Sequence, residues 1–107
     1  MSEKVTQKQA HDIFVKIKEA VMIDVREEEE YITGHAIGAR MLPLGDISSE
    51  TVEKIVPRKD TPIILYCRSG ARSAVAAQML DEMGYTRVFD AGGLLGWQYG
   101  LEHGYEI

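Results

Sequence analysis

The segment at positions 62–66 constrains the fold of this chain more than any other. It is a proline followed by Ile-Ile-Leu-Tyr, so it has no polar face. A strand of this kind is typical of a parallel sheet that is covered by helices on both faces. The segment Val21–Val25 is also short, apolar and rich in β-branched residues, apart from Asp24. Both segments are predicted to be buried strands.

Helical signals alternate with these strands. Thr6 and Gln9 form a capping-box pattern ahead of apolar residues at helical spacing. A short helix is predicted over 27–33, where carboxylates favour the first turn, and another over about 48–55, where a serine can cap it. The alternation of strand and helix predicts an α/β fold with a parallel sheet and right-handed crossovers.

The second half of the chain continues the same pattern. Further strands are predicted over 39–42 and 87–90, and a short helix is predicted near the C-terminus, to about Glu102. The longest helix is predicted to follow the 62–66 strand and to end at Gly84. Its apolar face is predicted to consist of Val75, Ala76, Met79, Leu80 and Met83.

Length and composition exclude several classes of protein. A chain of 107 residues is one domain by size, so we expect a single domain over 1–107. The net charge of -5 and the lack of a basic patch argue against nucleic-acid binding. No apolar run approaches the ~20 residues that span a bilayer. The N-terminus lacks the apolar segment of a signal peptide, so we expect a cytoplasmic protein without a membrane partner.

One cysteine, Cys67, lies where the 62–66 strand meets the following helix. A lone cysteine excludes an intrachain disulfide and a cysteine zinc cluster, so no metal site is expected. At this junction the thiol faces the first N–H groups of a helix, which favour the thiolate, as do Arg68 and Arg72. Gly70 can adopt a left-handed conformation that lets successive amides converge on one anion. The segment therefore predicts a nucleophile beside an anion site.

Short blocks of residues along the chain form a distinctive series. The blocks are Asp24-Val25-Arg26, Glu30-Tyr31, Gly34-His35, Gly38-Ala39, Pro43-Leu44, 67–73, Gly92-Gly93 and Gly96-Trp97. In their order and spacing the chain resembles the rhodanese family along nearly its whole length, and this makes the resemblance specific. One departure is visible: the family often has Gly-His-Ile-Pro-Gly-Ala, whereas this chain has Ala36 and Ile37 in place of the central Ile-Pro. We expect this departure to alter packing and leave the chemistry unchanged.

The resemblance implies a single rhodanese-like domain, with a central parallel sheet of about five strands and helices on both faces. It implies a sulfurtransferase that uses no cofactor and carries sulfur as a persulfide on Cys67. The donor would be thiosulfate or a related small anion, and the acceptor cyanide or a thiol. A thioredoxin-like or sulfur-relay protein is a further candidate partner. Arg68 stands where relatives that use mercaptopyruvate tend to have glycine, which favours thiosulfate or a protein persulfide.

The residues after Cys67 are the predicted substrate-binding group. Arg68 is expected to point outward to the anionic donor, and Arg72 to fix the loop or neutralise charge. The two serines either hydrogen-bond the sulfur or cap the loop and the helix. The whole group is Arg68, Ser69, Gly70, Ala71, Arg72 and Ser73.

Three residues outside this loop are predicted to support the site. Asp24 and Arg26 end a strand and are expected to form an ion pair beneath the site. His35 could act as a proton donor, but a histidine after a glycine in a turn is more often a hydrogen-bonded structural residue. Trp97 is expected to pack under the loop.

Two other functions fit part of the sequence. Rhodanese-fold phosphatases and arsenate reductases also place a cysteine and an arginine on such a loop, but their loop is one residue longer than the four residues between Cys67 and Arg72. The shorter loop suits a sulfur atom better than a tetrahedral oxyanion. The other alternative is a sulfur carrier or binding module that works with a dedicated protein partner.

Overall fold

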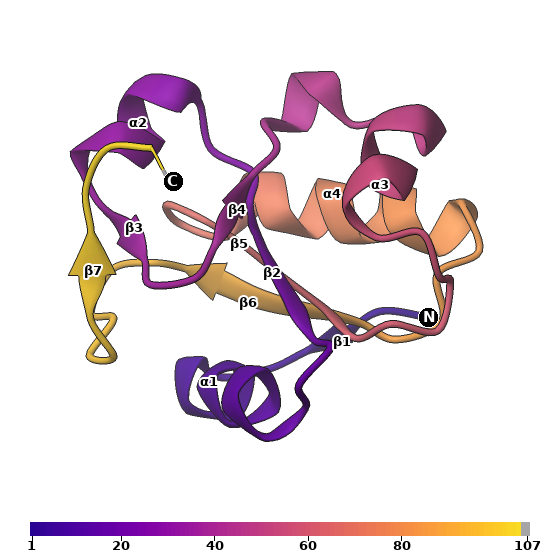
Figure 1. Ribbon diagram of the computed structural model, residues 1–107, viewed down its shortest axis with the longest axis horizontal. Helices are drawn as coiled ribbons and strands as arrows, with labels where there is room; N and C mark the ends of the chain where they lie inside the picture. Colours follow the sequence, from indigo (N-terminus) through magenta and orange to yellow (C-terminus); the bar gives the residue numbers. More distant parts are fainter. Residues whose placement is uncertain (106–107) are drawn as a thin grey trace.

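The computed structural model describes residues 1–105 and contains one five-stranded sheet in which every neighbouring pair of strands is parallel. This is the α/β fold with a central parallel sheet of five strands that the sequence predicts (Figure 1). From one edge to the other, the strands are β1 (Glu3–Lys4), β6 (Val88–Gly93), β5 (Ile63–Cys67), β2 (Val21–Asp24) and β4 (Arg40–Met41).

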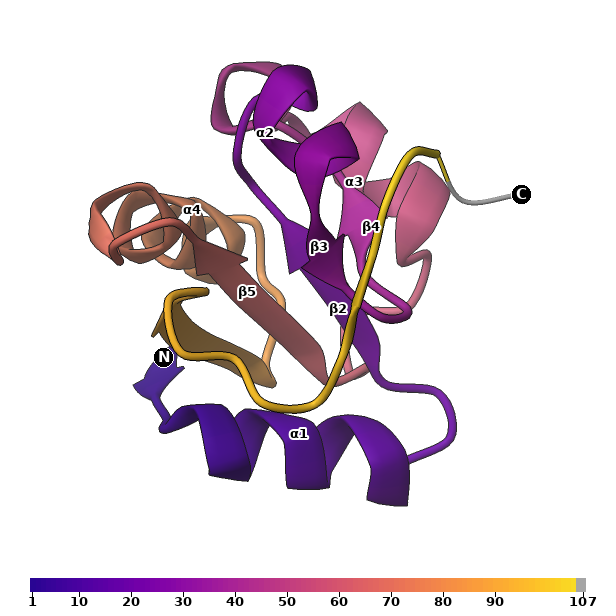
Figure 2. The same ribbon diagram turned by 90° about the vertical axis from the view of Figure 1, so that its left-hand side faces the viewer.

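Residues 1–105 form four α-helices, three of which pack on the faces of the sheet. α1 (Gln7–Lys16) lies on one face, whereas α3 (Ser49–Ile55) and α4 (Ala71–Glu82) lie on the other, as Figure 2 shows. α2 (Glu28–Thr33) follows β2, and a short 3-10 helix, η1 (Leu44–Asp46), follows β4. Within residues 1–105, no helix is long and apolar enough to cross a membrane.

The central strand β5 is buried at every position, as expected for a strand between two layers of helices. Side chains of successive residues point to opposite faces, so Leu65 joins one apolar cluster with α3 and α4. Ile64 and Tyr66 join a second cluster with Ala10 and Phe14 of α1. The sheet therefore separates two cores, and the carboxyl ends of β5, β2 and β6 share one edge, where ligands bind in folds of this class.

The capping residues that the sequence predicts for α1 and α3 are confirmed. Thr6 and Gln9 form the predicted capping box of α1. Ser48 caps α3 and accepts a hydrogen bond from the backbone N–H of Thr51. In each case the side chain supplies a partner for an N–H group that the helix leaves unpaired.

The predicted apolar face of the longest helix is wrong at Val75, whose side chain is 49% exposed. The side of α4 that faces the core carries Ala76, Ala77 and Leu80, and it begins with the buried Ser73. The hydrogen bond from the Ser73 hydroxyl to Asp90 satisfies a polar group in this apolar layer. The rest of the predicted face is confirmed, because Ala76 and Leu80 are buried and Met79 and Met83 pack against the same apolar cluster.

The predicted helix near the C-terminus is also wrong. The segment instead forms β7 (Leu101–Glu102), which pairs antiparallel with β3 (His35–Ala36). Gly96 and Gly100 have φ of 84° and 97°, and this left-handed backbone cannot continue a right-handed helix. Strands of two residues such as these leave no periodic pattern in a sequence, which is why β1, β3 and β7 escape prediction.

Candidate active site

Cys67 is the last residue of β5, and the loop that follows turns the chain directly into α4. Gly70 caps the helix in a left-handed conformation, with φ 108° and ψ -17°. This conformation, which the sequence predicts for Gly70, aims its N–H at the Cys67 sulfur, with N and Sγ 2.9 Å apart. The helix begins at Ala71, so Ala71, Arg72 and Ser73 belong to its first turn.

Two opposing effects act on the ionisation of Cys67, whose side chain is buried. Burial raises the pKa of the thiol, because it disfavours the charged form. The backbones of Ser73, Gly70 and Ser69 donate hydrogen bonds to the sulfur that lower that pKa, and together with the contact of the Ser73 side chain they outweigh the burial. The net pKa lies below the ordinary value, as predicted, and its leading causes are these hydrogen bonds, with no arginine among them.

Arg72 forms an ion pair with a residue of α2. Its guanidinium binds both carboxylate oxygens of Glu30 on α2, at 2.6 and 3.0 Å. This bidentate pair lowers the pKa of Glu30 to about 2, against the partial burial of the carboxyl, which opposes ionisation. Arg72 therefore ties the first turn of α4 to α2, which is the loop-fixing arrangement that the sequence allows.

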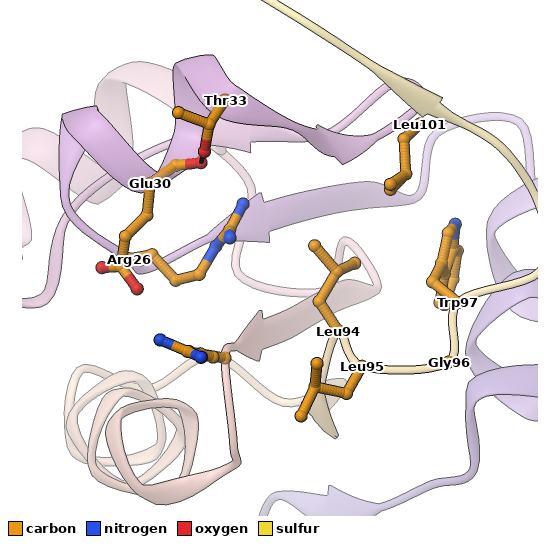
Figure 3. Close-up of a pocket in the computed structure, with 9 residues that line it drawn as sticks. Arg26, Glu30, Thr33, Leu94, Leu95, Gly96, Trp97 and Leu101 are labelled. Atoms are coloured by element: carbon orange, nitrogen blue, oxygen red, sulfur yellow. Dashed lines mark hydrogen bonds between the residues drawn. The ribbon is translucent and has the colours of Figure 1, made fainter.

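Arg68 and Ser69 are exposed at the mouth of the site. Arg68 lines a cleft of about 380 Å³ whose other cation, Arg26, is engaged with Asp24. Figure 3 shows apolar side chains on the side of the cleft opposite Arg26 and Glu30. These apolar side chains are Leu94, Leu95, Trp97 and Leu101. The cleft thus has one charged wall and one apolar wall.

The end of β6 and the residue that follows it contact the loop between β5 and α4. Leu94 donates its backbone N–H to the Cys67 carbonyl at 2.9 Å. At Gly93, a β-carbon would overlap the carbonyl oxygen of Arg68, so only glycine allows the loop and the strand to approach this closely. Trp97, expected to pack under the loop, packs against the apolar cluster on the α1 side of the sheet and forms part of the cleft wall.

Asp24 and Arg26 form the predicted ion pair. The Arg26 guanidinium meets the carboxylate at 2.7 to 3.1 Å and also donates to the carbonyl of Gly34 at 2.7 Å. Tyr66 donates its hydroxyl to Asp24 at 2.7 Å, and burial together with this carboxylate raises the pKa of the phenol. The pair therefore joins the ends of β2 and β5 to the turn before β3.

His35 is buried in the structure and lies in the wall formed by β3 and β7. Its Nδ1 is 2.8 Å from the carbonyl of Tyr31, and its ring stacks on the Tyr31 ring with centroids 3.7 Å apart. Its Nε2 lies 3.3 Å from Glu102 Oε1, without the alignment of a hydrogen bond. Among the described residues, no hydrogen bond joins His35 to the loop 67–73, which favours the structural interpretation.

Asp90 is the buried polar residue that the sequence does not single out. Its carboxylate accepts hydrogen bonds from the Ser73 hydroxyl at 2.7 Å and from the Gly92 N–H at 2.9 Å. The one available signal is an aspartate within an apolar strand, a feature shared with Asp24. Across residues 1–105, no cluster of three or more His, Cys, Asp or Glu could hold a metal ion.

Comparisons with known proteins place this geometry in context. Residues 6–99 match the family model described as Rhodanese-like domain. The thiosulfate sulfurtransferase PspE of Escherichia coli (strain K12) is 43% identical over 72 residues, which are 67% of this chain and 68% of that protein. The putative sulfurtransferase YtwF of Bacillus subtilis (strain 168) is 37% identical over 83 residues, 76% of each chain.

A solved structure described as rhodanese with anions, from E. coli, superposes with a TM-score of 0.74 at 38% identity. The superposition covers 79% of this chain and 99% of that one.

Proposed function

The chain belongs to the rhodanese-like domain family, and from this membership we propose that it is a sulfurtransferase that carries sulfur as a persulfide on Cys67. The observation that supports the proposal most is the Cys67 thiol at the N-terminus of α4, with Gly70 N 2.9 Å from Sγ. A sulfur held in this way is favoured as an anion, both as thiolate and as persulfide.

In the first half of the reaction, the Cys67 thiolate attacks the outer sulfur of thiosulfate. The bond between the two sulfur atoms of the donor breaks, and sulfite leaves with the bonding electron pair. A new Sγ–S bond forms, and the outer sulfur of the persulfide carries one negative charge. The inward-facing amides stabilise this charge, and no general base is needed when the thiolate already exists.

In the second half, cyanide or a thiolate attacks the outer sulfur of the persulfide. The Sγ–S bond breaks, and Cys67 leaves as the thiolate that began the cycle, while the product is thiocyanate or a new persulfide. The chain has one cysteine, so no internal thiol can resolve the persulfide into a disulfide. Sulfur therefore leaves only to an external acceptor.

The proposed roles of the neighbouring residues follow from their contacts. Arg68, exposed in the cleft, meets the anionic donor. Arg72 positions the loop through Glu30, and the amides of Ser69 and Gly70 hold the sulfur. The remaining members of the group support them: Ala71 and Ser73 in the first turn of α4, and Asp24, Arg26 and His35 beyond the loop.

The name of the E. coli relative, thiosulfate sulfurtransferase, makes thiosulfate the first donor to test. After incubation with thiosulfate, intact mass spectrometry should show one added sulfur atom on the protein and none on Cys67→Ser. Cyanide or a thiol such as reduced glutathione should then remove it. Sulfur transfer that continues unchanged in Cys67→Ser would contradict the proposal.

One observation favours a second candidate, a sulfur carrier with a protein partner of thioredoxin-like or sulfur-relay type. Leu95 and Leu101, on the apolar wall of the cleft, are 73% and 47% exposed. A carrier would load with thiosulfate or a donor protein but lose its sulfur only slowly to cyanide and small thiols. Hydrolysis of an aryl phosphate, lost in Cys67→Ser, would instead support phosphatase chemistry.

A further inference from the structure

The carboxylate of Asp90 is a buried charged group without a role in the reaction described above. The residue is 6% exposed and lies on β6, in register with Leu65 of β5. Within the described part of the chain, no cation forms an ion pair with it. Its Oδ1 is held instead by Gly92 N and by the hydroxyl of Ser73, which is fully buried.

The Ser73 hydroxyl has one proton and three acceptors within reach. Oγ lies 2.7 Å from Asp90 Oδ1, 3.1 Å from the Gly70 carbonyl and 3.7 Å from the Cys67 sulfur. A hydroxyl bonded to a carboxylate makes the shorter and stronger hydrogen bond. In this geometry the hydroxyl proton of Ser73 is donated to Asp90, and a lone pair of Ser73 Oγ faces the sulfur.

The contact with Ser73 suits the thiol, thiolate and persulfide states of Cys67 to different degrees. A neutral thiol can donate its proton to Ser73 Oγ, so it is well accommodated. A thiolate needs a donor, and Ser73 can serve it only by turning its proton away from Asp90. In the persulfide the charge moves to the outer sulfur, and the Ser73 proton can return to the carboxylate.

We propose that Asp90 is a positioning residue for sulfur transfer that withholds the Ser73 proton from the Cys67 thiolate. The proposal rests on the function proposed above. It holds that Asp90 and Ser73 together balance two requirements that the reaction places on the Cys67 sulfur. Cys67 must first be a strong nucleophile and then a good leaving group. A thiolate with fewer hydrogen bonds is the stronger nucleophile, whereas a thiolate of lower pKa leaves faster.

The test is a double-mutant cycle with Ser73→Ala and Asp90→Asn, read out as the pH midpoint of Cys67 alkylation by iodoacetamide. The single cysteine makes the reaction site-specific. In Asp90→Asn the amide oxygen can still accept from Gly92, but it competes weakly for the Ser73 proton, so the proton moves to the sulfur. The midpoint should fall by about one pH unit, as expected for one hydrogen bond to a charged group.

The coupling between the two substitutions separates this proposal from the loss of a nearby negative charge. Loss of charge alone lowers the midpoint equally with or without Ser73. The proposal instead requires that Ser73→Ala shift the midpoint by under about 0.3 units in the wild type and raise it by about one unit in the Asp90→Asn background. Additive shifts would overturn it.

Other charges near the pair are the same in all four proteins and cancel in the cycle. Lys4 of β1 is the register partner of Asp90, and Arg68 and Arg72 follow Cys67 in the chain. Glu30 is bound to Arg72. The Asp24–Arg26 pair, at the end of β2, completes the set.

Rapid-quench mass spectrometry of the two half-reactions gives a second readout. Above both midpoints, Asp90→Asn should load sulfur from thiosulfate about threefold more slowly and release it to cyanide faster, because a one-unit fall in pKa lowers nucleophilicity by that factor. An equal loss in both half-reactions would indicate a merely structural role and overturn the proposal.

The alkylation cycle needs no sulfur donor, so it is informative even if thiosulfate loading fails and the proposed function is wrong. Ser73→Ala alone also tests the proposal if Asp90→Asn does not fold. A rise of about one unit in its midpoint would mean that the Ser73 proton already lies on the sulfur, against the proposal.

Discussion

The ion pair between Glu30 and Arg72 connects α2 to the first turn of α4, which directly follows the reactive loop. The distances of 2.6 and 3.0 Å describe a fork-to-fork contact, which orients both side chains as well as attracting them. Each side chain is about a third exposed, at 32% for Arg72 and 29% for Glu30, so water screens the pair. Its effect on position therefore exceeds its effect on stability.

The pair nevertheless makes stability depend on pH. The folded-state pKa of Glu30 is about 2, below the ordinary 4.5. A depressed pKa contributes stability that is present above pH 4.5 and is lost as the pH falls toward 2. Against Glu30→Gln, the wild type should be more stable by about 1 kcal/mol at pH 7, and the difference should vanish near pH 2.

Urea unfolding at a series of pH values measures this difference. Glutamine can keep the hydrogen bond that Glu30 accepts from Glu27 N, so the N-terminus of α2 is preserved. Glu28→Gln, at an exposed position of the same turn, serves as the control and should show no such pH dependence. A difference between wild type and Glu30→Gln that is constant from pH 7 to 2 would contradict the assignment.

At the scale of elements, the site depends on how closely β6 approaches the loop between β5 and α4. Gly93 is the contact point, because any side chain there would meet the carbonyl of Arg68. The amides that surround Cys67 belong to the same turn, so a displaced carbonyl also re-aims the N–H groups. The distance between β6 and the loop thus determines how the N–H groups of the loop are aimed at the Cys67 sulfur.

Gly93→Ala should therefore disturb function before it disturbs folding. We expect loading of Cys67 from thiosulfate to slow by about tenfold or more, because small displacements of a pre-arranged site have effects of this size. The pKa of Cys67 should rise. Gly45→Ala is the control, since a β-carbon at Gly45 in η1 meets nothing and loading should be unchanged. Equal loading rates in the two variants would refute the contact.

At the scale of the whole molecule, one sheet joins two apolar clusters. The cluster on the side of α3 and α4 includes Leu80, and the cluster on the side of α1 has Trp97 packed against it. Both clusters use side chains of β5, so neither can lose its packing without exposing the central strand. Cooperative unfolding of the entire domain follows from this shared strand.

The single tryptophan makes cooperativity measurable. Trp97 fluorescence and far-ultraviolet circular dichroism should show the same urea midpoint. Leu80→Ala lies in the opposite cluster from Trp97, so it should lower the free energy of unfolding by about 2–5 kcal/mol in both signals equally. A fluorescence midpoint that stays in place while the dichroism midpoint moves would show that the clusters unfold separately.

Much of the fold is predictable because its signals are local. An apolar run such as 62–66 needs cover on both faces, and a capping box such as that of Thr6 and Gln9 is complete within four positions. The exposure of Val75 was not predictable in this way, since the buried face of α4 depends on which strand residues it packs against, as Ser73 does on Asp90. The C-terminal strand β7 depends likewise on β3, a partner far away in the sequence.

The sequence alone determined that Cys67 ends a buried strand at a glycine-containing turn into a helix, because strand period, glycine and helix start are properties of neighbouring residues. Only the tertiary structure decided which charges reach that sulfur. In the folded chain Arg72 is paired with Glu30, Arg68 lines the cleft, and Asp90 accepts a hydrogen bond from Ser73. Hydrogen bonds act over about 3 Å between atoms, and folding alone sets which distant residues come that close.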